Sequence, residues 1–348
     1  MRVMDARTAW SQRIAGLGPR GAAVGVLFGL ASAVSACGSR TGLELDDVRT
    51  PTEPDSSTPP VPPLDAAPDV AIPISPVQTP PACVALPSPS AYVVTTADNL
   101  WQFNPSATTS AAMLQLVGHL DCPLATGLGL GVCQDPDNPN ALIAASPFSM
   151  AVDRTGTAYV VYCDGEVFVV DTQGVTCKAT GLDVPGAYGG AFTEDTTDAN
   201  ETFFVATGDM QDTLASFNTT TLAINTIGAF SPAAMYAELT GTGAGDLFAF
   251  YLNNGSEMSI AKVDKANAEL TNILPLPGLP RGRGWAFVFW GGDFYTFTGA
   301  VSGTGATQMM FDATVITRIS PADGSQTFVA NMNELVVGAG VSTCAPQR

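Results

Sequence analysis

Cysteine is the residue type with the most definite chemistry in this sequence. The chain has seven: Cys37, Cys83, Cys122, Cys133, Cys163, Cys177 and Cys344. A zinc site is not indicated, because no C-x-x-C pair occurs and the chain has a single histidine. With the first cysteine set aside, the other six form an even set, as in exported proteins that hold their fold with disulfides. We therefore predict three disulfides and neither a metal nor another cofactor.

Residues suited to acid–base or nucleophilic catalysis are sparse. His119 is the only histidine, and neither a G-x-S-x-G nucleophile motif nor a phosphate-binding loop occurs. Asp153, Glu194, Asp195 and Glu238 lie in or beside expected inner strands, but only Glu238 has a setting within one. Glycoside hydrolysis needs two facing carboxylates. An enzyme is therefore not favoured, and a glycoside hydrolase is kept as an alternative.

One short segment combines cations with an aromatic residue. Arg281 and Arg283 alternate with glycines directly before Trp285. Guanidinium groups beside an indole ring can bind an acidic or sugar-like ligand. Together with Glu238 these three residues form the candidate ligand-binding set. The alternative is a loop with two solubilising arginines and a core tryptophan, since Trp285 begins an apolar strand.

The charge of the chain excludes one class of partner. It carries 14 Lys and Arg against 32 Asp and Glu, a net charge of −18. Beyond residue 36 there are 10 basic and 31 acidic residues, which gives about −21. Such a surface repels phosphate backbones, so a nucleic acid is not expected as a partner.

The first 36 residues have the features of an export signal. Four arginines lie within residues 2–20, an apolar run covers residues 22–31, and small residues precede Cys37. Residues 34–37, Val-Ser-Ala-Cys, resemble the lipobox of bacterial lipoproteins. This resemblance implies lipid attachment to the Cys37 thiol and cleavage before it; an ordinary signal peptide is the alternative. No aspartate follows Cys37, so we expect an outer rather than an inner membrane.

A proline-rich stretch separates this signal from the rest of the chain. Residues 41–82 contain 11 prolines. Proline fixes φ and has no N–H, so neither helix nor sheet is expected, and the segment is predicted to be an extended, disordered spacer. The predicted organisation is a lipoprotein signal peptide (1–36), a lipid-anchored linker (37–82) and one folded domain (83–348).

The remaining sequence repeats. Similar apolar segments begin at Ala158, Thr202, Asp246 and Asp293, with spacings of 44, 44 and 47 residues. A strand precedes each segment and two more follow it, so each repeat supplies four strands. Four strands per repeat of this length are typical of a propeller blade, so we predict an all-β propeller rather than a β-sandwich.

The two ends of the domain complete one blade. The first repeat lacks its leading strand, and residues 336–344 supply a spare one. Pairing it with residues 88–119 closes the ring and leaves no open sheet edge. The count is five blades; a sixth, hidden in residues 121–146, is possible, but that stretch lacks strand periodicity and is interpreted as an insertion.

The predicted strands restrict the disulfide pairing. Cys83 and Cys344 fall in the blade that both chain ends build, so they are expected to pair. Cys163 and Cys177 belong to the second and fourth strands of one blade, about 9.6 Å apart, whereas a disulfide spans about 4.4–6.8 Å between Cα atoms. Cys122–Cys177 and Cys133–Cys163 are therefore preferred, and both would hold the insertion on the second blade.

Several segments resemble a family of bacterial lipoproteins with propeller-type domains. They are residues 147–160, 165–172, 238–243, 285–298 and 336–346, together with the opening residues 37–43. The resemblance covers nearly the whole chain. It implies a lipid-anchored propeller and implies no activity.

The longest loops of the predicted propeller share one face. They are residues 121–146, 276–284 and 299–313. We therefore predict a monomeric envelope lipoprotein, attached to a membrane by its lipid, whose propeller is a non-catalytic binding module. Its partner is expected to be a glycan, an acidic ligand or a protein. A structural or adhesive scaffold is a further alternative to the glycoside hydrolase.

Overall fold

The computed structural model describes residues 71–76, 83, 91–123, 131–135, 138, 140–184, 186–195, 200–208, 212–254, 257–302 and 309–348. The expected signal peptide, the expected lipid attachment site at Cys37 and most of the expected linker lie outside these residues. No helix in the described part of the chain has the length and apolar character needed to cross a membrane.

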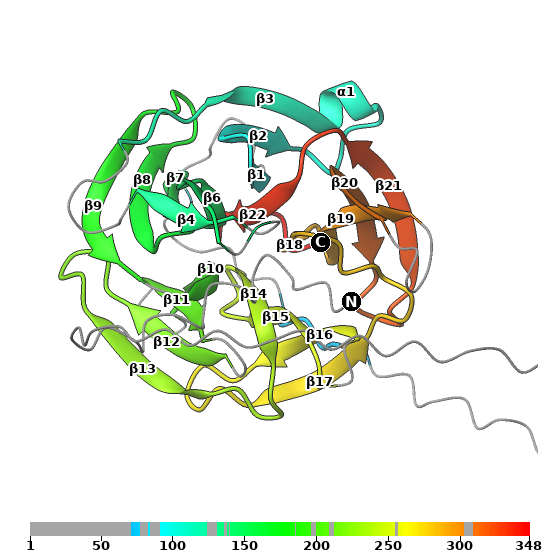
Figure 1. Ribbon diagram of the computed structural model, residues 1–348. Coiled ribbons are helices and arrows are strands. Elements are labelled where there is room, and N and C mark those ends of the chain that lie inside the picture. Colours follow the sequence, from blue (N-terminus) through cyan, green and yellow to red (C-terminus); the bar gives the residue numbers. More distant parts are fainter. Residues whose placement is uncertain are drawn as a thin grey trace, which may run out of the picture. The chain divides into compact units, whose positions relative to one another are not determined.

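Five four-stranded antiparallel sheets surround a common axis, so the prediction of a five-bladed propeller is confirmed (Figure 1). From the axis outwards, blade 1 contains β22 (Val336–Val341), β1 (Ala91–Thr95), β2 (Asn99–Phe103) and β3 (Leu114–His119). Blade 2 contains β6 (Pro147–Val152), β7 (Thr157–Tyr162), β8 (Glu166–Asp171) and β9 (Cys177–Asp183). Blade 3 contains β10 (Ala187–Glu194), β11 (Glu201–Thr207), β12 (Thr213–Phe217) and β13 (Ile224–Ala229).

The last two blades follow the same order. Blade 4 contains β14 (Met235–Gly241), β15 (Leu247–Leu252), β16 (Met258–Val263) and β17 (Leu270–Pro275). Blade 5 contains β18 (Trp285–Trp290), β19 (Asp293–Ser302), β20 (Met309–Ile319) and β21 (Gln326–Met332). A single helical turn, α1 (Ser110–Met113), lies between β2 and β3.

Burial explains the sequence of each strand. Strands near the axis are covered on both sides, and β15, with the sequence LFAFYL, is buried at every position. Such strands read as continuous apolar runs because neither face meets water. The outer strand β13, INTIGA, has no buried residue. The apolar repeats found in the sequence are therefore the inner parts of successive blades.

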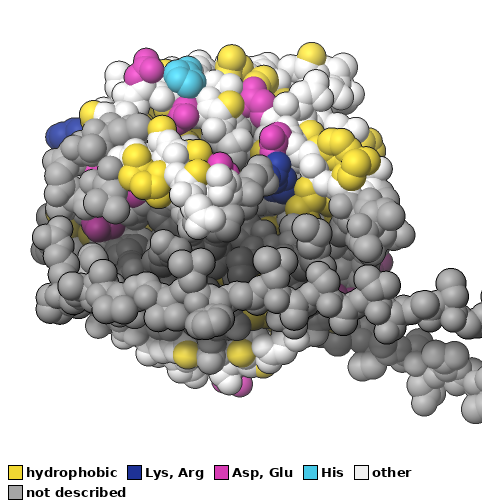
Figure 2. Space-filling view, in the orientation of Figure 1, with side chains coloured by type: hydrophobic (Ala, Val, Ile, Leu, Met, Phe, Trp, Pro, Cys, Tyr) yellow, Lys and Arg dark blue, Asp and Glu magenta, His cyan; other side chains and the backbone are white. Residues whose placement is uncertain are grey.

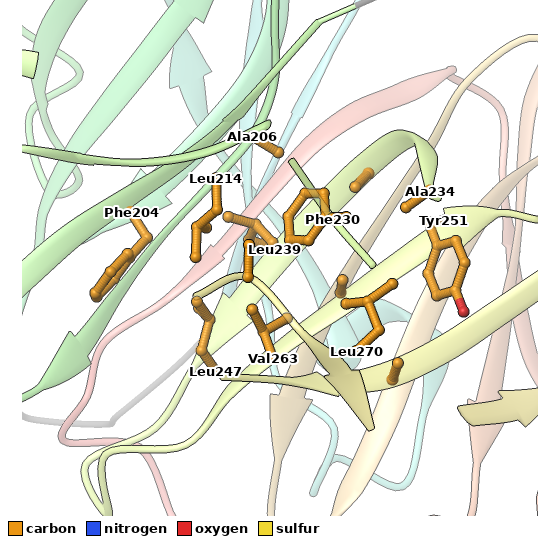
Figure 3. Close-up of a cluster of buried hydrophobic side chains, with 14 of the residues drawn as sticks. Phe204, Ala206, Leu214, Phe230, Ala234, Leu239, Leu247, Tyr251, Val263 and Leu270 are labelled. Carbon is orange, nitrogen blue, oxygen red and sulfur yellow. The ribbon is translucent and has the colours of Figure 1, made fainter. Parts of the chain in front are cut away.

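The hydrophobic core is divided into five clusters, one between each pair of neighbouring blades. Figure 3 shows the cluster between blades 3 and 4, in which Phe204 and Leu214 of blade 3 lie near Leu247 and Val263 of blade 4. Each blade thus buries its apolar side chains only against its neighbours, so the ring must close for every blade to be covered.

Pairing of β1 with β22 closes the ring. Ala91 lies opposite Val341 and Val94 opposite Gly338, and Figure 1 shows the red strand β22 beside β1. Cys83 and Cys344 form a disulfide at this junction, with Cα atoms 5.4 Å apart. The blade built from both chain ends is therefore present as predicted, and so is its disulfide.

The described residues within 121–146 do not form a sixth blade. The described part of this insertion contains a two-stranded hairpin, β4 (Val132–Gln134) with β5 (Leu142–Ala144). The structure contains the disulfides Cys122–Cys177 and Cys133–Cys163, which are the other two predicted pairs. The insertion is thus linked twice to blade 2.

Residues 299–313 were expected to be a loop, and this expectation is wrong for residues 299–302 and 309–313. β19 continues to Ser302 and β20 begins at Met309, so the strands run on beyond the blade as a longer hairpin. A register shift between Gly299 and Val301 interrupts the pairing, which resumes as Val301 opposite Met310. Such an irregularity hides the alternation of apolar and polar residues from sequence reading.

The end of the proline-rich segment packs against the propeller. Ile72 is buried in the cluster between blades 4 and 5, and its N–H donates to the Pro321 carbonyl at 2.8 Å. The Ser75 N–H and hydroxyl donate to the two Asp246 carboxylate oxygens at 2.7 and 2.8 Å. Residues 71–76 therefore belong to the same compact unit as the blades.

Candidate functional site

The propeller has two chemically different faces. The hairpin face, as we call it, carries the connections from the second to the third strand of each blade and from each outer strand to the next blade. It includes the β4–β5 hairpin, residues 276–284 and the end of the β19–β20 hairpin. The turn face, on the opposite side, carries the connections between first and second and between third and fourth strands.

Two of the four predicted ligand-binding residues are buried, which corrects the sequence interpretation. Trp285 has no exposed surface, and its indole N–H donates to the Tyr236 carbonyl at 3.1 Å. It lies in the cluster between blades 4 and 5, so it is a core residue and not a surface for a ligand. The sequence signal for a core tryptophan was the apolar strand that begins at Trp285.

Glu238 is the other predicted ligand-binding residue that is buried. Its side chain is 2% exposed, and it accepts a hydrogen bond from the Ser149 hydroxyl at 3.3 Å. The bond joins β14 to β6 across the axis. The described inner strands hold one other carboxylate, Glu194, which is paired with Arg154. These two carboxylates do not form the open pair that glycoside hydrolysis requires.

The axis itself is closed by close strand contacts. A Cβ atom at Gly189 or Gly241 would collide with the backbone of the neighbouring inner strand, at Ala237 and Phe192 respectively. At Gly338 it would lie 2.7 Å from the Met150 nitrogen. The space left between the described inner-strand residues around Ala191 does not admit a water molecule. A small molecule therefore has no axial pocket among these residues.

Arg281 and Arg283 lie on the hairpin face, as predicted. Both are partly exposed. The Arg283 guanidinium pairs with Asp312 of β20, with 3.2 Å between Nη1 and Oδ1. The Arg283 side chain is 22% exposed and the Asp312 side chain is 72% exposed. This pair links residues 276–284 to the β19–β20 hairpin.

Large apolar side chains are exposed on the two hairpins of this face. Leu142 and Ile143 of β5 are 69% and 40% exposed, and Met309 and Phe311 of β20 are 59% and 44% exposed. Figure 2 shows two groups of hydrophobic side chains, one over the region of β4 and one over that of β20 and β21. Sequence reasoning missed these residues because both segments were assigned to loops. The run Met309-Met310-Phe311 was the available signal.

The β4–β5 hairpin is held in place. Cys133 is buried and joined to Cys163 at the end of β7. The Gly131 N–H donates to the Asp164 carboxylate at 2.8 Å. A disulfide and a hydrogen bond to a charged group both restrict this hairpin, so Leu142 and Ile143 are presented on a preorganised support.

The turn face contains a buried ionic network that sequence reasoning also missed. Arg154 pairs with Glu194 and with Glu201, both of blade 3, and the distance from its Nε to Glu201 Oε2 is 3.3 Å. Glu201 also accepts a hydrogen bond from the Thr343 hydroxyl, beyond β22 of blade 1. Burial is the main cause that raises the pKa of Glu201. Blades 1, 2 and 3 are thus joined through one carboxylate.

A second charged cluster on this face involves Asp246 of blade 4. Its carboxylate pairs with the Lys262 ammonium at 2.6 Å and accepts the two hydrogen bonds from Ser75. Nearby, the Lys265 ammonium donates to the Glu194 carbonyl at 3.2 Å. Burial lowers the pKa of Lys265. These contacts position the turns and the N-terminal segment.

The remaining sequence candidates do not gather into a site. His119 ends β3; its Nε2 lies 3.9 Å from an Asp121 carboxylate oxygen, and both side chains are exposed. Within the described residues, no group of three or more His, Cys, Asp or Glu side chains is arranged to hold a metal ion.

Comparison with known proteins gives no family assignment. No protein-family model and no curated protein sequence matches the chain. Solved structures that are similar include hydrazine synthase from Kuenenia stuttgartiensis (17% identity, TM-score 0.37, covering 73% of this chain and 69% of that one). A protein of unknown function from Bacteroides caccae has 11% identity and a TM-score of 0.39, with 73% and 98% covered.

A GH43 protein of the Bacteroides ovatus xyloglucan locus has 14% identity and a TM-score of 0.38, and the match covers 53% of this chain and 41% of that one. With identities of 17% or less and TM-scores below 0.5, these similarities say nothing about function.

Proposed function

We propose that this protein is an exported lipoprotein, attached to a membrane through Cys37, whose propeller binds a protein partner through the hairpin face. The observation that supports this most directly is the exposed apolar surface of Leu142, Ile143, Met309 and Phe311. The binding is non-catalytic. The basic start of the chain, the lipobox resemblance and the three disulfides support export.

The distribution of exposed apolar residues favours a binding role. Seven large apolar side chains are exposed among the described residues, and four of them lie on these two hairpins. Gathered apolar side chains mark contact surfaces, whereas single ones scattered over a surface need no explanation. Met, Phe and Arg are also enriched in protein interfaces. A face with such side chains, and with no axial pocket among the described inner-strand residues, fits a protein better than a small molecule.

The negative charge of this chain indicates the charge expected on its partner. The chain beyond residue 36 has a net charge of about −21. Opposite charge speeds association and discriminates between partners, so a partner with a basic rim around an apolar centre is favoured. The Arg283–Asp312 pair on this face then supplies polar contacts. Arg281 and Arg283 thereby keep a binding role, with carboxylate or carbonyl groups of the partner as acceptors in place of a sugar.

The size of the complex tests this proposal. Membranes of the producing cells are solubilised in mild detergent, and the protein is followed by size-exclusion chromatography. The wild-type protein is expected to elute as a complex, and the double variant Leu142→Ser, Phe311→Ser as a free chain. The matched control is Ile224→Ser, Phe328→Ser, which changes two residues of similar exposure on outer strands. The proposal is contradicted if the wild-type protein and the Leu142→Ser, Phe311→Ser variant elute at the same volume.

Anchoring is tested separately. Cells fed a palmitate analogue are expected to label the wild-type protein, because diacylglyceryl transfer to the Cys37 thiol and acylation of the new amine add fatty-acid chains. The variant Cys37→Ala is expected to lose the label and to leave the membrane fraction. Label that persists in the variant contradicts the lipobox interpretation.

A further inference from the structure

A cavity of about 330 Å³ opens on the turn face, beside blade 2 and the adjoining Tyr92 of β1. We call it the blade 2 cavity. It lies among the turns that join β6 to β7 and β8 to β9, away from the hairpin face. Neither the proposed partner surface nor the ionic network around Arg154 includes the residues that line it.

The lining is rich in hydroxyl and amide groups. Thr155, Thr157 and Thr176 bring hydroxyls, Tyr92 brings a phenol and Gln173 brings a carboxamide. The Thr155 hydroxyl already donates to the Asp153 carboxylate at 2.7 Å and lies 3.0 Å from the Thr157 hydroxyl, so these two groups keep only part of their hydrogen-bonding capacity for a ligand. Hydroxyls and carboxamides both donate and accept hydrogen bonds, as the hydroxyls of a sugar do. Tyr92 also adds an aromatic ring, whose apolar surface complements the C–H face of a pyranose.

The walls of the cavity are fixed by contacts within blade 2. The Thr172 hydroxyl donates to the Gly156 carbonyl at 2.6 Å and so ties one turn to the other. The Asp171 carboxylate accepts a hydrogen bond from the backbone N–H of Gln173 at 3.0 Å. Thr176 and Lys178, which both line the cavity, flank Cys177, and Cys177 is joined to Cys122. A binding group whose support is locked loses less entropy when a ligand arrives.

Charge and size restrict the ligand. The lining contains one carboxylate, Asp171, and one ammonium, Lys178, so it has no net charge. The rest of the chain is strongly acidic, which disfavours an anion. The volume is at the lower end of the range of about 300–1,000 Å³ for ligand sites, which suits one sugar ring and not a long chain.

We propose that the blade 2 cavity binds a neutral monosaccharide unit, either free or at the end of a glycan. This site goes beyond the partner surface proposed above and is independent of it, because it lies on the other face and shares no residue with it.

Saturation-transfer NMR with the mature chain tests the site. The probes are D-glucose, D-galactose, D-mannose and N-acetyl-D-glucosamine, each also as its methyl glycoside. At least one probe is expected to bind saturably with a Kd of about 1 mM. Tighter binding of the methyl glycoside identifies a glycan end as the ligand, and tighter binding of the reducing sugar identifies the free form. No saturable binding by any probe up to about 10 mM overturns the proposal.

Variants assign the binding to this cavity. Gln173→Ala with Thr176→Val removes two exposed polar groups without touching the core, and is expected to weaken binding about tenfold or more. The matched control is Thr220→Val, an exposed threonine in the corresponding turn of blade 3. Equal binding by the double variant and the wild type overturns the proposal. Leu142→Ser, Phe311→Ser is expected to leave sugar binding unchanged, which separates this test from that of the partner surface.

Discussion

At the scale of single residues, charge is buried where blades meet. Arg154 follows Asp153 in a turn, and its sequence context indicates only a solvated loop. In the structure its side chain is 13% exposed and bridges Glu194 and Glu201. The sequence could not predict this network, because its members are 40 and 47 residues apart and meet only once the blades are packed.

Loss of Arg154 should be costly for stability. The change Arg154→Met leaves two largely buried carboxylates without their guanidinium, and we expect the free energy of unfolding to fall by about 3–5 kcal/mol. Denaturant unfolding followed by fluorescence measures it. The control is Arg318→Met, which removes the pair of Arg318, 52% exposed, with Asp293; about 1 kcal/mol or less is expected there. Equal losses in the two variants would show that the Arg154 network does not stabilise the fold.

The stability should also depend on pH. Burial raises the pKa of Asp98, Asp183 and Glu201 above the ordinary values of 3.8 and 4.5. The native state then binds protons that the unfolded state releases, so the free energy of unfolding falls as pH rises from these ordinary values through the raised pKa of each group. We expect the Tm, measured by calorimetry, to be higher near these ordinary pKa values than at pH 7.

One of these groups can be isolated. Desolvation and the nearby charge of Asp164 raise the pKa of Asp183, so Asp183→Asn should flatten the change of Tm with pH. Asp323 is the control, because hydrogen bonds from Ser325 lower the pKa of its exposed carboxyl and move its titration below this range. A slope that is as steep in Asp183→Asn as in Asp323→Asn would contradict the assignment.

At the scale of elements, the repeat of four strands could be predicted because inner strands are buried on both faces and therefore apolar throughout, as β15 shows. The β19–β20 hairpin could not, because a register shift breaks its alternation near Gly299. Trp285 illustrates a related limit. A tryptophan next to arginines has the same sequence pattern in a binding loop as at the start of a core strand, and only packing decides between them.

At several glycines the inner strands lie too close together for a side chain. A Cβ atom at Gly241 would collide with the Phe192 carbonyl oxygen of β10, so we expect Gly241→Ala to destabilise the protein by about 2 kcal/mol or more, as overpacking does. Thermal unfolding measures the change. Gly228→Ala is the control, since its Cβ would meet only the Asn267 carbonyl oxygen at 3.4 Å. A Tm equal in both variants would contradict the close axial packing.

At the scale of the whole molecule, closure holds the ring together. Cys83 and Cys344 are 261 residues apart in sequence and join the two ends of the domain. This pair could be predicted from the missing strand of the first repeat. A blade that takes strands from both ends of the domain places those ends side by side. The partner surface could not be predicted in this way, since it depends on which side chains the hairpins leave exposed.

Removing this disulfide should loosen the ring. For Cys83→Ser, Cys344→Ser we expect a loss of about 2–5 kcal/mol in the free energy of unfolding, since the link restricts the unfolded chain over a long loop. Hydrogen exchange should rise first in β1 and β22, where the closing pairs lie. Unchanged exchange in these two strands would show that strand pairing alone closes the ring.

Site-specific photo-crosslinking in intact producing cells tests the central claim, that the hairpin face binds a protein partner. A photoreactive residue is placed at Leu142, Phe311, Ile224 or Phe328, all of which are exposed. The account predicts that Leu142 and Phe311 give adducts to the same protein, and that Ile224 and Phe328, on outer strands, give none. Adducts of equal yield from all four positions, or from the outer strands alone, would contradict it.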